Sequence, residues 1–477
     1  MAVILESERK SFKARVFLAL IYSVLSLGAV TMVYPFAVMI AGSFSSAYDY
    51  NRQSPIVSAL FSKSDRFMRS IATYFKAFPR EVYPDAPETW TTWTEVAKDT
   101  KGVRLFAERE LEAYKNAEFL AESKEIAREY LLALKKVDPL LLSCHYDQRD
   151  VPRFAREKYG TIENLNKAWD VPHKSLFDIS FSAEARLKSG MKPLDAAKAT
   201  DYQELKKRYV DEAIAHGDFM ARTVPSDLKS NAADIRNALA VQFCEHGTSD
   251  FFKSALGNYR LIGDYLFLRG GAFFNTLILV VLSILATLTV NPLAAYALSR
   301  FRLKSTESII LFILATMAFP AAVTAIPGFL LLRDLGMLNT FAALVLPTMA
   351  NGMSIFILKG FFDALPRELY EAAAIDGASE WTVFRRITLP MMTPILAVNA
   401  LNAFIHAYAS WEWAFLVCHK ESHWTLAVWL YQMSVETFAG QPWCVMAGFV
   451  VVSIPTAVVF LLCQKIILRG IVLPSMK

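Results

Sequence analysis

The sequence predicts an all-α membrane protein with six transmembrane helices and a mainly α-helical domain inserted between the first and the second. The chain has 477 residues, of which 54% are hydrophobic and 20% are charged. The charges are unevenly distributed. Residues 45–268 hold 33 Lys and Arg and 33 Asp and Glu, whereas the other 253 residues hold only 17 and 12. This contrast excludes both a uniform soluble enzyme and a bare bundle of membrane helices.

Six apolar segments are long enough to cross a hydrocarbon core of about 30 Å, which takes roughly 20 helical residues. They cover residues 16–42, 273–298, 309–332, 340–362, 391–417 and 443–468. Several contain Pro or Asn, which membrane helices tolerate where neighbouring helices satisfy the freed backbone groups. The first segment is too long for the apolar region of a signal peptide, so we expect it to remain as an anchor.

Lys and Arg in the connections predict the orientation of the helices. With the N-terminus inside, 14 of them fall in cytoplasmic segments and two, Arg333 and Lys420, in the short outer loops. We therefore expect both termini in the cytoplasm and the inserted domain outside. The predicted parts are a tail (1–15), the first helix (16–44), the inserted domain (45–268) and a membrane core (269–477) with a cytoplasmic loop (363–390).

The inserted domain has the features of a folded, mainly helical unit. Helical periodicity covers residues 103–136 and 202–220, and tryptophans occur throughout. The segment 158–169 resembles a helical element of some glycoside hydrolase barrels but brings no pair of catalytic carboxylates. We expect this segment to be a helix that packs through Leu165 and Trp169.

The sequence predicts no catalytic residues and no metal site in this chain. No CxxC, HExxH or G-x-x-x-x-G-K-[ST] motif occurs, so if ATP drives the protein another chain hydrolyses it. Cysteine spacing leaves the pairs Cys144–Cys244 and Cys418–Cys444 open as disulfides outside the membrane, with unpaired thiols as the default expectation.

The loop between the fourth and fifth apolar segments is the most informative part of the chain. It predicts a helix, a turn and a second helix. Pro366 suits a first helical turn, and Gly377 suits the left-handed position that ends a helix. Ser379 can cap the next helix, and Pro390 stops it.

This loop is similar to the EAA motif of binding-protein-dependent ABC transporter permeases. The motif is Glu-Ala-Ala, three residues, Gly, nine residues, Ile, one residue and Leu-Pro, and every fixed element is present at its spacing. The residues concerned, together with the neighbouring aspartate, are Glu371, Ala372, Ala373, Asp376, Gly377, Ile387, Leu389 and Pro390. The run 294–302 and other flanking stretches resemble the maltose-type sugar permease subfamily.

The resemblance implies a fold of the ABC importer permease type, in the bacterial inner membrane, that imports a sugar or oligosaccharide. It implies three protein partners besides lipid: an ATP-binding-cassette ATPase dimer that docks on the EAA loop, a second permease subunit forming a heterodimer, and an extracytoplasmic solute-binding protein. The ATPase would use ATP and Mg²⁺, and this chain would bind no cofactor.

An importer of a non-sugar polar solute, such as a polyamine or a phosphonate, is the open alternative. A transmembrane sensor is disfavoured because the inside segments are short.

Polar side chains in the fifth apolar segment are candidates for the substrate pathway. Asn399, Asn402 and His406 share one helix face, and Tyr408 and Trp411 follow near the outer end. Amide, imidazole and aromatic groups can bind sugar hydroxyls and stack on sugar rings. Hydrogen bonding between helices is the alternative. Asn291 and Asn351 are expected to be structural.

The role of the inserted domain is open. Its position favours a docking surface for the solute-binding protein or the partner permease, and the alternatives are a spacer and a second sugar-binding module that works alone. Its balanced charge argues against nucleic acid as a partner.

Overall fold

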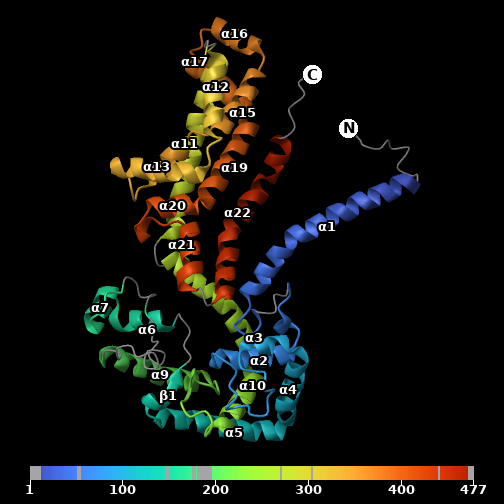
Figure 1. Ribbon diagram of the computed structural model, residues 1–477, viewed down its shortest axis with the longest axis vertical. Helices are drawn as coiled ribbons and strands as arrows, with labels where there is room; N and C mark the ends of the chain where they lie inside the picture. The colour runs from blue at the N-terminus through green and yellow to red at the C-terminus, as the bar shows by residue number, and fades with distance from the viewer. Residues whose placement is uncertain are drawn as a thin grey trace. The chain divides into compact units, whose positions relative to one another are not determined.

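A computed structural model describes residues 12–50, 55–144, 150–173, 179, 196–268, 271–301, 305–438 and 441–470, and this part of the chain is mainly α-helical (Figure 1). The chain forms two compact units. The first contains the described residues up to Ile262 together with 441–450, and the second contains those of 263–438 together with 451–470.

The first unit consists of one long apolar helix and the helices of the predicted insert. Its helices are α1 (Phe12–Ser43), α2 (Lys63–Tyr74), α3 (Trp93–Lys98), α4 (Thr100–Glu112), α5 (Ala117–Lys136), α6 (Asp150–Tyr159), α7 (Ile162–Trp169), α9 (Ala196–His216) and α10 (Ala232–Gly263). The two strands β1 (Leu142–Cys144) and β2 (Thr223–Pro225) form a small antiparallel sheet that the sequence did not predict. Strands of three residues are too short to produce a recognisable alternation.

Local capping explains where several of these helices begin. Ser62, Thr92 and Asp99 each accept a backbone N–H from the first turn of the following helix. The predicted helix over 103–136 is divided because the side chain of Asn116 accepts the N–H of Glu118 at 2.9 Å and so starts α5. The hydrophobic periodicity of the sequence continues across this break because α4 and α5 each bury one face against the same core.

An aromatic cluster forms the centre of the larger core of the first unit. The ring of Phe106 lies 5.2 Å from that of Tyr83 and 5.4 Å from that of Trp90, both in edge contact. Trp90 is fully buried and Phe106 is 4% exposed. The burial of such large side chains is the main source of stability in a unit of this size.

A smaller core holds α6, α7 and α9 together. Leu165 and Trp169 are both buried in it, as expected for a packed helix. The predicted single helix over 158–169 is instead the end of α6 and the whole of α7, with a turn at Gly160. The buried carboxylate of Asp201 accepts the indole N–H of Trp169 at 2.8 Å and the hydroxyl of Tyr159 at 2.6 Å.

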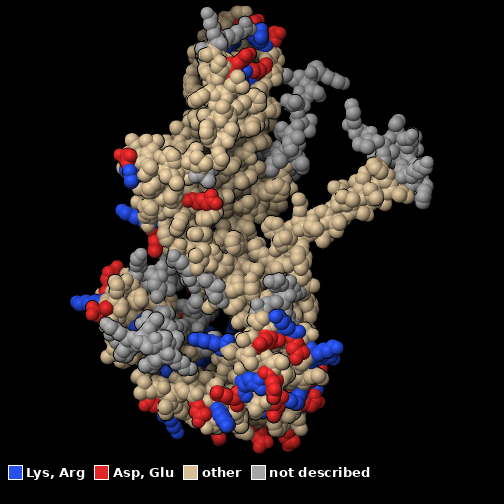
Figure 2. All heavy atoms as spheres, viewed as in Figure 1, with Lys and Arg blue, Asp and Glu red and all other residues tan. Residues whose placement is uncertain are grey.

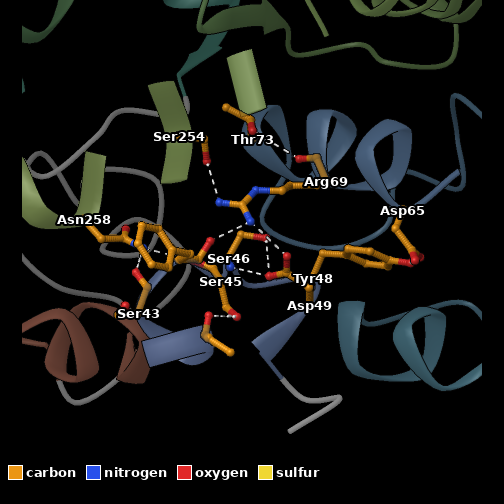
Figure 3. Close-up of polar contacts among 12 residues, drawn as sticks. Ser43, Ser45, Ser46, Tyr48, Asp49, Asp65, Arg69, Thr73, Ser254 and Asn258 are labelled. Atoms are coloured by element: carbon orange, nitrogen blue, oxygen red, sulfur yellow. Dashed lines mark hydrogen bonds and ion pairs between the residues drawn. The ribbon is translucent and has the colours of Figure 1, made fainter. Parts of the chain in front are cut away.

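The end of α1 is attached to the inserted helices by buried polar contacts (Figure 3). The guanidinium of Arg69 in α2 donates to the carbonyl of Phe44 at 2.7 Å and to the carboxylate of Asp49 at 2.9 Å. It also donates to the hydroxyl of Ser254 in α10 at 3.2 Å. Asn258 of α10 donates to the carbonyls of Ser43 and Ser45. These contacts fix the direction in which the chain leaves α1.

The second unit contains the remaining helices. They are α11 (Ala272–Arg300), α12 (Thr306–Thr316), α13 (Ala321–Asp334), α14 (Phe341–Val345), α15 (Gly352–Asp363), α16 (Arg367–Ile375), α17 (Glu380–Val383), α18 (Leu389–Met391), α19 (Thr393–Ala409), α20 (Trp411–Val417), α21 (Leu426–Gln432) and most of α22 (Pro442–Gly470). Figure 1 shows α11, α15 and α19 side by side, and α11 makes its most extensive contacts with the other two. In Figure 2 the charged side chains of this unit gather where α16 and α17 lie and are sparse along the visible membrane-length helices.

Three helices are long and apolar enough to cross a membrane: residues 16–43, 272–300 and 442–464. Two further pairs qualify if each is counted as one bent span, which gives up to five among the described residues. The pairs are Phe341–Thr348 with Gly352–Asp363, bent by 49°, and Glu380–Met391 with Thr393–Ala409, bent by 82°.

The third predicted span is not one continuous helix in the structure. Residues 309–332 are divided between α12 and α13 by a break at 317–320. Pro320 precedes α13, and because proline has no N–H it cannot continue the ladder of α12. Hydropathy measures only composition and therefore did not detect this break.

Asn291 and Asn351 make structural contacts, as expected. The side-chain oxygen of buried Asn291 in α11 accepts the backbone N–H of Asn351 at 3.0 Å. Asn351 caps α15 by accepting the N–H of Ser354 at 2.9 Å. The bend between α14 and α15 is therefore bonded to α11 at this point.

Cys244, Cys418 and Cys463 are free thiols. Neither of the two candidate pairings, Cys144 with Cys244 or Cys418 with Cys444, is therefore formed as a disulfide in this structure.

Candidate functional site

The segment with the EAA pattern forms a compact helical hairpin at one end of the second unit. Pro366 immediately precedes α16, and Ser379 precedes α17, where its hydroxyl accepts the N–H of Thr382 at 3.3 Å. Both helix starts follow the prediction, because fixed φ at Pro and side-chain capping at Ser favour helix initiation.

The turn between the two helices is a Schellman motif built on Gly377. The N–H of Ala378 donates to the carbonyl of Ala373 at 2.9 Å, and the N–H of Gly377 donates to the carbonyl of Ala374 at 3.1 Å. Gly377 has φ = +74°. A Cβ here would meet no atom within 4 Å, so the requirement for glycine comes from the backbone conformation alone.

After α17 the backbone widens into a π-helical turn, Phe384–Thr388, and then continues through α18. The chain bends by 82° before α19. Ile387 and Leu389 are half-buried along this path, and Pro390 is exposed. The hairpin therefore continues directly into a helix of the bundle.

One face of the hairpin packs on the bundle and the other is exposed. Ala373 and Tyr370 of α16 are buried in a cluster with side chains of α11, α15 and α19. Glu371, Ala372 and Asp376 are exposed. Within Glu371-Ala372-Ala373 only the third residue faces the bundle, as the geometry of the helix requires.

Two large apolar side chains stand on the exposed face. Ile375 is 86% exposed and Trp381 is 59% exposed. Neither residue was predicted to be functional, although an apolar residue in a loop rich in charged residues is a usable signal. Exposed apolar side chains beside Glu371 and Asp376 form a surface suited to docking on another protein.

The C-terminal end of α11 fastens both helices of the hairpin. The hydroxyl of Tyr296 donates to the carboxylate of Glu380 in α17 at 2.7 Å, and Arg300 lies 3.6 Å from the same carboxylate. The guanidinium of Arg300 also covers the ring of Tyr370 in α16 at 4.7 Å from its centroid. These residues were not identified from the sequence because their partners lie 70 to 84 positions away.

Tyr296→Phe is expected to loosen the hairpin without unfolding the protein. The change removes the bond to Glu380 but keeps the ring, and a hydrogen bond to a half-exposed carboxylate stabilises by about 1 kcal/mol. We expect a fall of about two- to fivefold in coupled uptake at normal abundance, measured with the reconstituted transporter. Tyr370→Phe is the matched control, because it keeps the ring under Arg300. Equal losses in both variants would contradict this role of Tyr296.

The predicted pathway residues occupy different environments. Asn399 is 4% exposed and donates to the carbonyl of Ile395, one turn earlier, at 3.0 Å. Asn402 and His406 are exposed on the surface of this chain. Asn399 thus makes an intrahelical contact, and Asn402 and His406 remain available to a ligand or a neighbouring subunit.

The two aromatic pathway candidates are held by neighbouring segments. The hydroxyl of Tyr408 donates to the carbonyl of Val452 at 2.6 Å. The ring of Trp411 stacks on Tyr431 with a centroid distance of 4.3 Å and an interplanar angle of 21°. Their other faces remain candidates for ligand contact.

The hairpin and the helices around it coincide with the part of the chain that resembles known proteins. Residues 290–472 match the family described as "Binding-protein-dependent transport system inner membrane component". The chain is 34% identical over 234 residues to the trehalose/maltose transport system permease protein MalG of Thermococcus litoralis, a match that covers 47% of this chain and 82% of that protein. This chain belongs to that family.

Two further relatives match a similar part of the chain. The lactose transport system permease protein LacG of Rhizobium radiobacter is 30% identical, covering 42% of this chain and 72% of that protein. The sn-glycerol-3-phosphate transport system permease protein UgpE of Rhizobium meliloti is also 30% identical, covering 42% and 71%. The chain therefore contains a permease of the ABC importer type, a transport component of the membrane. More than half of it lies outside each of these matches.

Proposed function

We propose that this permease transports a sugar or oligosaccharide and couples to its ATPase through the hairpin at 363–390. The observation that carries the proposal is the construction of the hairpin: a rigid Schellman turn at Gly377, one face buried on the bundle, and Ile375 and Trp381 exposed on the other. This is the form of a helical element that seats in a groove of a partner protein.

The contacts of the hairpin suggest how a movement of the ATPase dimer reaches the membrane. A displacement of α16 and α17 acts on α11 through Tyr296 and Arg300, and on α19 through the continuous backbone after Pro390. Rigid helices then transmit the displacement as a switch between inward-facing and outward-facing states. Glu371 and Asp376 serve docking in this scheme and take part in no chemical step.

The proposed assembly contains two copies of the ATPase, a second permease that forms a heterodimer with this chain, and a solute-binding protein. We place six membrane crossings in this chain, with both termini in the cytoplasm, and the inserted domain on the outer side. There it would contact the solute-binding protein or the partner permease. The charge asymmetry of the connections supports this orientation.

Support for a sugar comes from the substrates in the names of the relatives, trehalose/maltose and lactose. The glycerol-3-phosphate relative supports a second candidate, a non-sugar polar solute. The deciding experiment is the rate of ATP hydrolysis by the complete complex in proteoliposomes, with trehalose, maltose, lactose or sn-glycerol 3-phosphate added with the binding protein. We expect stimulation by at least one sugar. Stimulation by glycerol phosphate alone would reject the sugar assignment.

The orientation is tested by labelling single cysteines in a protein whose five cysteines are replaced by serine. We expect Glu88→Cys, in the inserted domain, to react with a membrane-impermeant maleimide applied outside intact cells. Ala374→Cys, on the exposed face of α16, is expected to react only after the membrane is opened. Labelling of Ala374→Cys from outside would overturn the proposed topology.

A further inference from the structure

A cavity of about 570 Å³ lies in the first unit, between α5 and the segment that joins β2 to α10. This volume is within the range of about 300–1,000 Å³ found for small-molecule sites. Much of its wall is apolar and includes Tyr130, Leu134, Val137 and Pro225. None of the functions proposed above uses this cavity.

The cavity wall is held in place by buried contacts. The ammonium group of Lys206, in α9, donates to the carbonyl of Pro139 at 3.1 Å and to that of Leu142 at 2.5 Å. Leu142 pairs with Pro225 in the small sheet. The loop after α5 and the strand β2 are thus tied together before any ligand arrives, which reduces the ordering cost of binding on that side of the cavity.

The charged side chains that line the cavity are all acidic and exposed, and the neighbouring Lys229 acts on one of them, Asp227. Three carboxylates line it, those of Glu129, Asp227 and Asp234, and no Lys, Arg or His is among the described residues of its lining. Hydrogen bonds from Ser230 lower the pKa of Asp227, so this carboxylate is ionised at neutral pH. The predicted insert as a whole has no net charge, so the excess of negative charge at the cavity is local to this site.

The lining also contains a buried hydroxyl group without a hydrogen-bond partner among the described residues, that of Tyr130. The side chain of Tyr130 is 93% buried, since only 7% is exposed. Burial raises the pKa of this phenol, and the charge of Asp234 raises it further, so it stays neutral and can accept an N–H. Nearly all buried polar groups have a partner, and an exception inside a cavity points to one that binds there.

We propose that this cavity binds an aliphatic polyamine, a flexible cation with methylene segments between its ammonium groups. The methylenes match the apolar wall formed by Leu134, Val137 and Pro225. The ammonium groups match the three carboxylates and donate to the hydroxyl of Tyr130. The excess of negative charge among the lining side chains favours a cation over an anion, and the apolar wall distinguishes the ligand from a hydrated metal ion.

The test measures binding of spermidine to the full-length protein in nanodiscs of neutral lipid by isothermal titration calorimetry. We expect saturable binding that a 50-fold excess of Mg²⁺ does not abolish. The double variant Glu129→Gln/Asp234→Asn should bind at least about tenfold more weakly, because a hydrogen bond to a charged group is worth about tenfold or more in affinity. Glu88→Gln removes an exposed charge outside the cavity and should bind as the wild type does.

Tyr130→Phe provides a second, independent variant. The hydroxyl of Tyr130 has no hydrogen-bond partner among the described residues. Its removal therefore breaks no hydrogen bond among them and should leave the melting temperature unchanged. We expect spermidine to bind this variant about three- to tenfold more weakly. No saturable binding to the wild type, full displacement by Mg²⁺, equal affinity of the carboxylate variant, or tighter binding of maltose than of spermidine would each overturn the proposal. Because the readout is binding, it is independent of which solute the permease transports.

Discussion

Gly377→Val is expected to abolish coupled uptake while the protein still inserts into the membrane at normal abundance. Gly377 has φ = +74°, a conformation that costs an L-residue about 1–2 kcal/mol and a β-branched residue more. The Schellman bonds of Ala378 and Gly377 would then break or the hairpin would change its angle. We expect solute uptake to fall by tenfold or more, with residual ATP hydrolysis no longer stimulated by solute.

The control for this prediction is Gly377→Asn. Asparagine adds a side chain of similar size but tolerates the left-handed conformation, and no atom lies within 4 Å of the added Cβ. Uptake should therefore recover to within about threefold of wild type. If valine and asparagine behave alike, or if the valine protein transports normally, the turn geometry is not what couples the hairpin to transport.

Arg69→Met is expected to have the largest effect on stability in the first unit. The side chains of Arg69 and Asp49 are 2% and 3% exposed, and they form an ion pair at 2.9 Å. Burial lowers the pKa of Arg69, and the charge of Asp49 opposes this shift. Methionine would leave the Asp49 carboxylate buried without its partner. Such changes cost about 3–5 kcal/mol.

The measurement is the thermal unfolding midpoint of the purified full-length protein, with unfolding of the inserted domain monitored by its sensitivity to proteolysis. Arg66→Met, on the same helix, is the matched control, because Arg66 is only half-buried and forms no ion pair within the described residues. Adding Asp49→Asn to Arg69→Met should restore part of the loss, because the uncompensated charge disappears. An equal effect of the Arg66 and Arg69 changes would show that the buried pair does not stabilise the junction with α1.

Features that depend on neighbouring residues were predictable from the sequence. The helical character of the insert, the helix starts at Pro366 and Ser379 and the left-handed Gly377 all follow from capping, backbone restriction and hydrophobic periodicity. The EAA spacing also identified the family, since it fixes residue types within a single stretch of 20 positions.

Other features required the tertiary structure, because they join residues that are far apart in the chain. The attachment of the hairpin to α11 joins Tyr296 to Glu380, and the junction below α1 joins Arg69 to Asp49 and Ser254. The break at Pro320 shows a limit of hydropathy, which reports how apolar a segment is and not whether it is one helix.

Local patterns in the sequence were enough to predict the family, the helical character and the position of the hairpin at 363–390. Each of these depends on backbone preferences and side-chain types within one or two helical turns. The exposed side chains of the hairpin, the attachment of α1 and the cavity with three carboxylates beside α5 became visible in the folded structure alone. These depend on close packing between segments separated by up to about 200 residues, which no local pattern encodes.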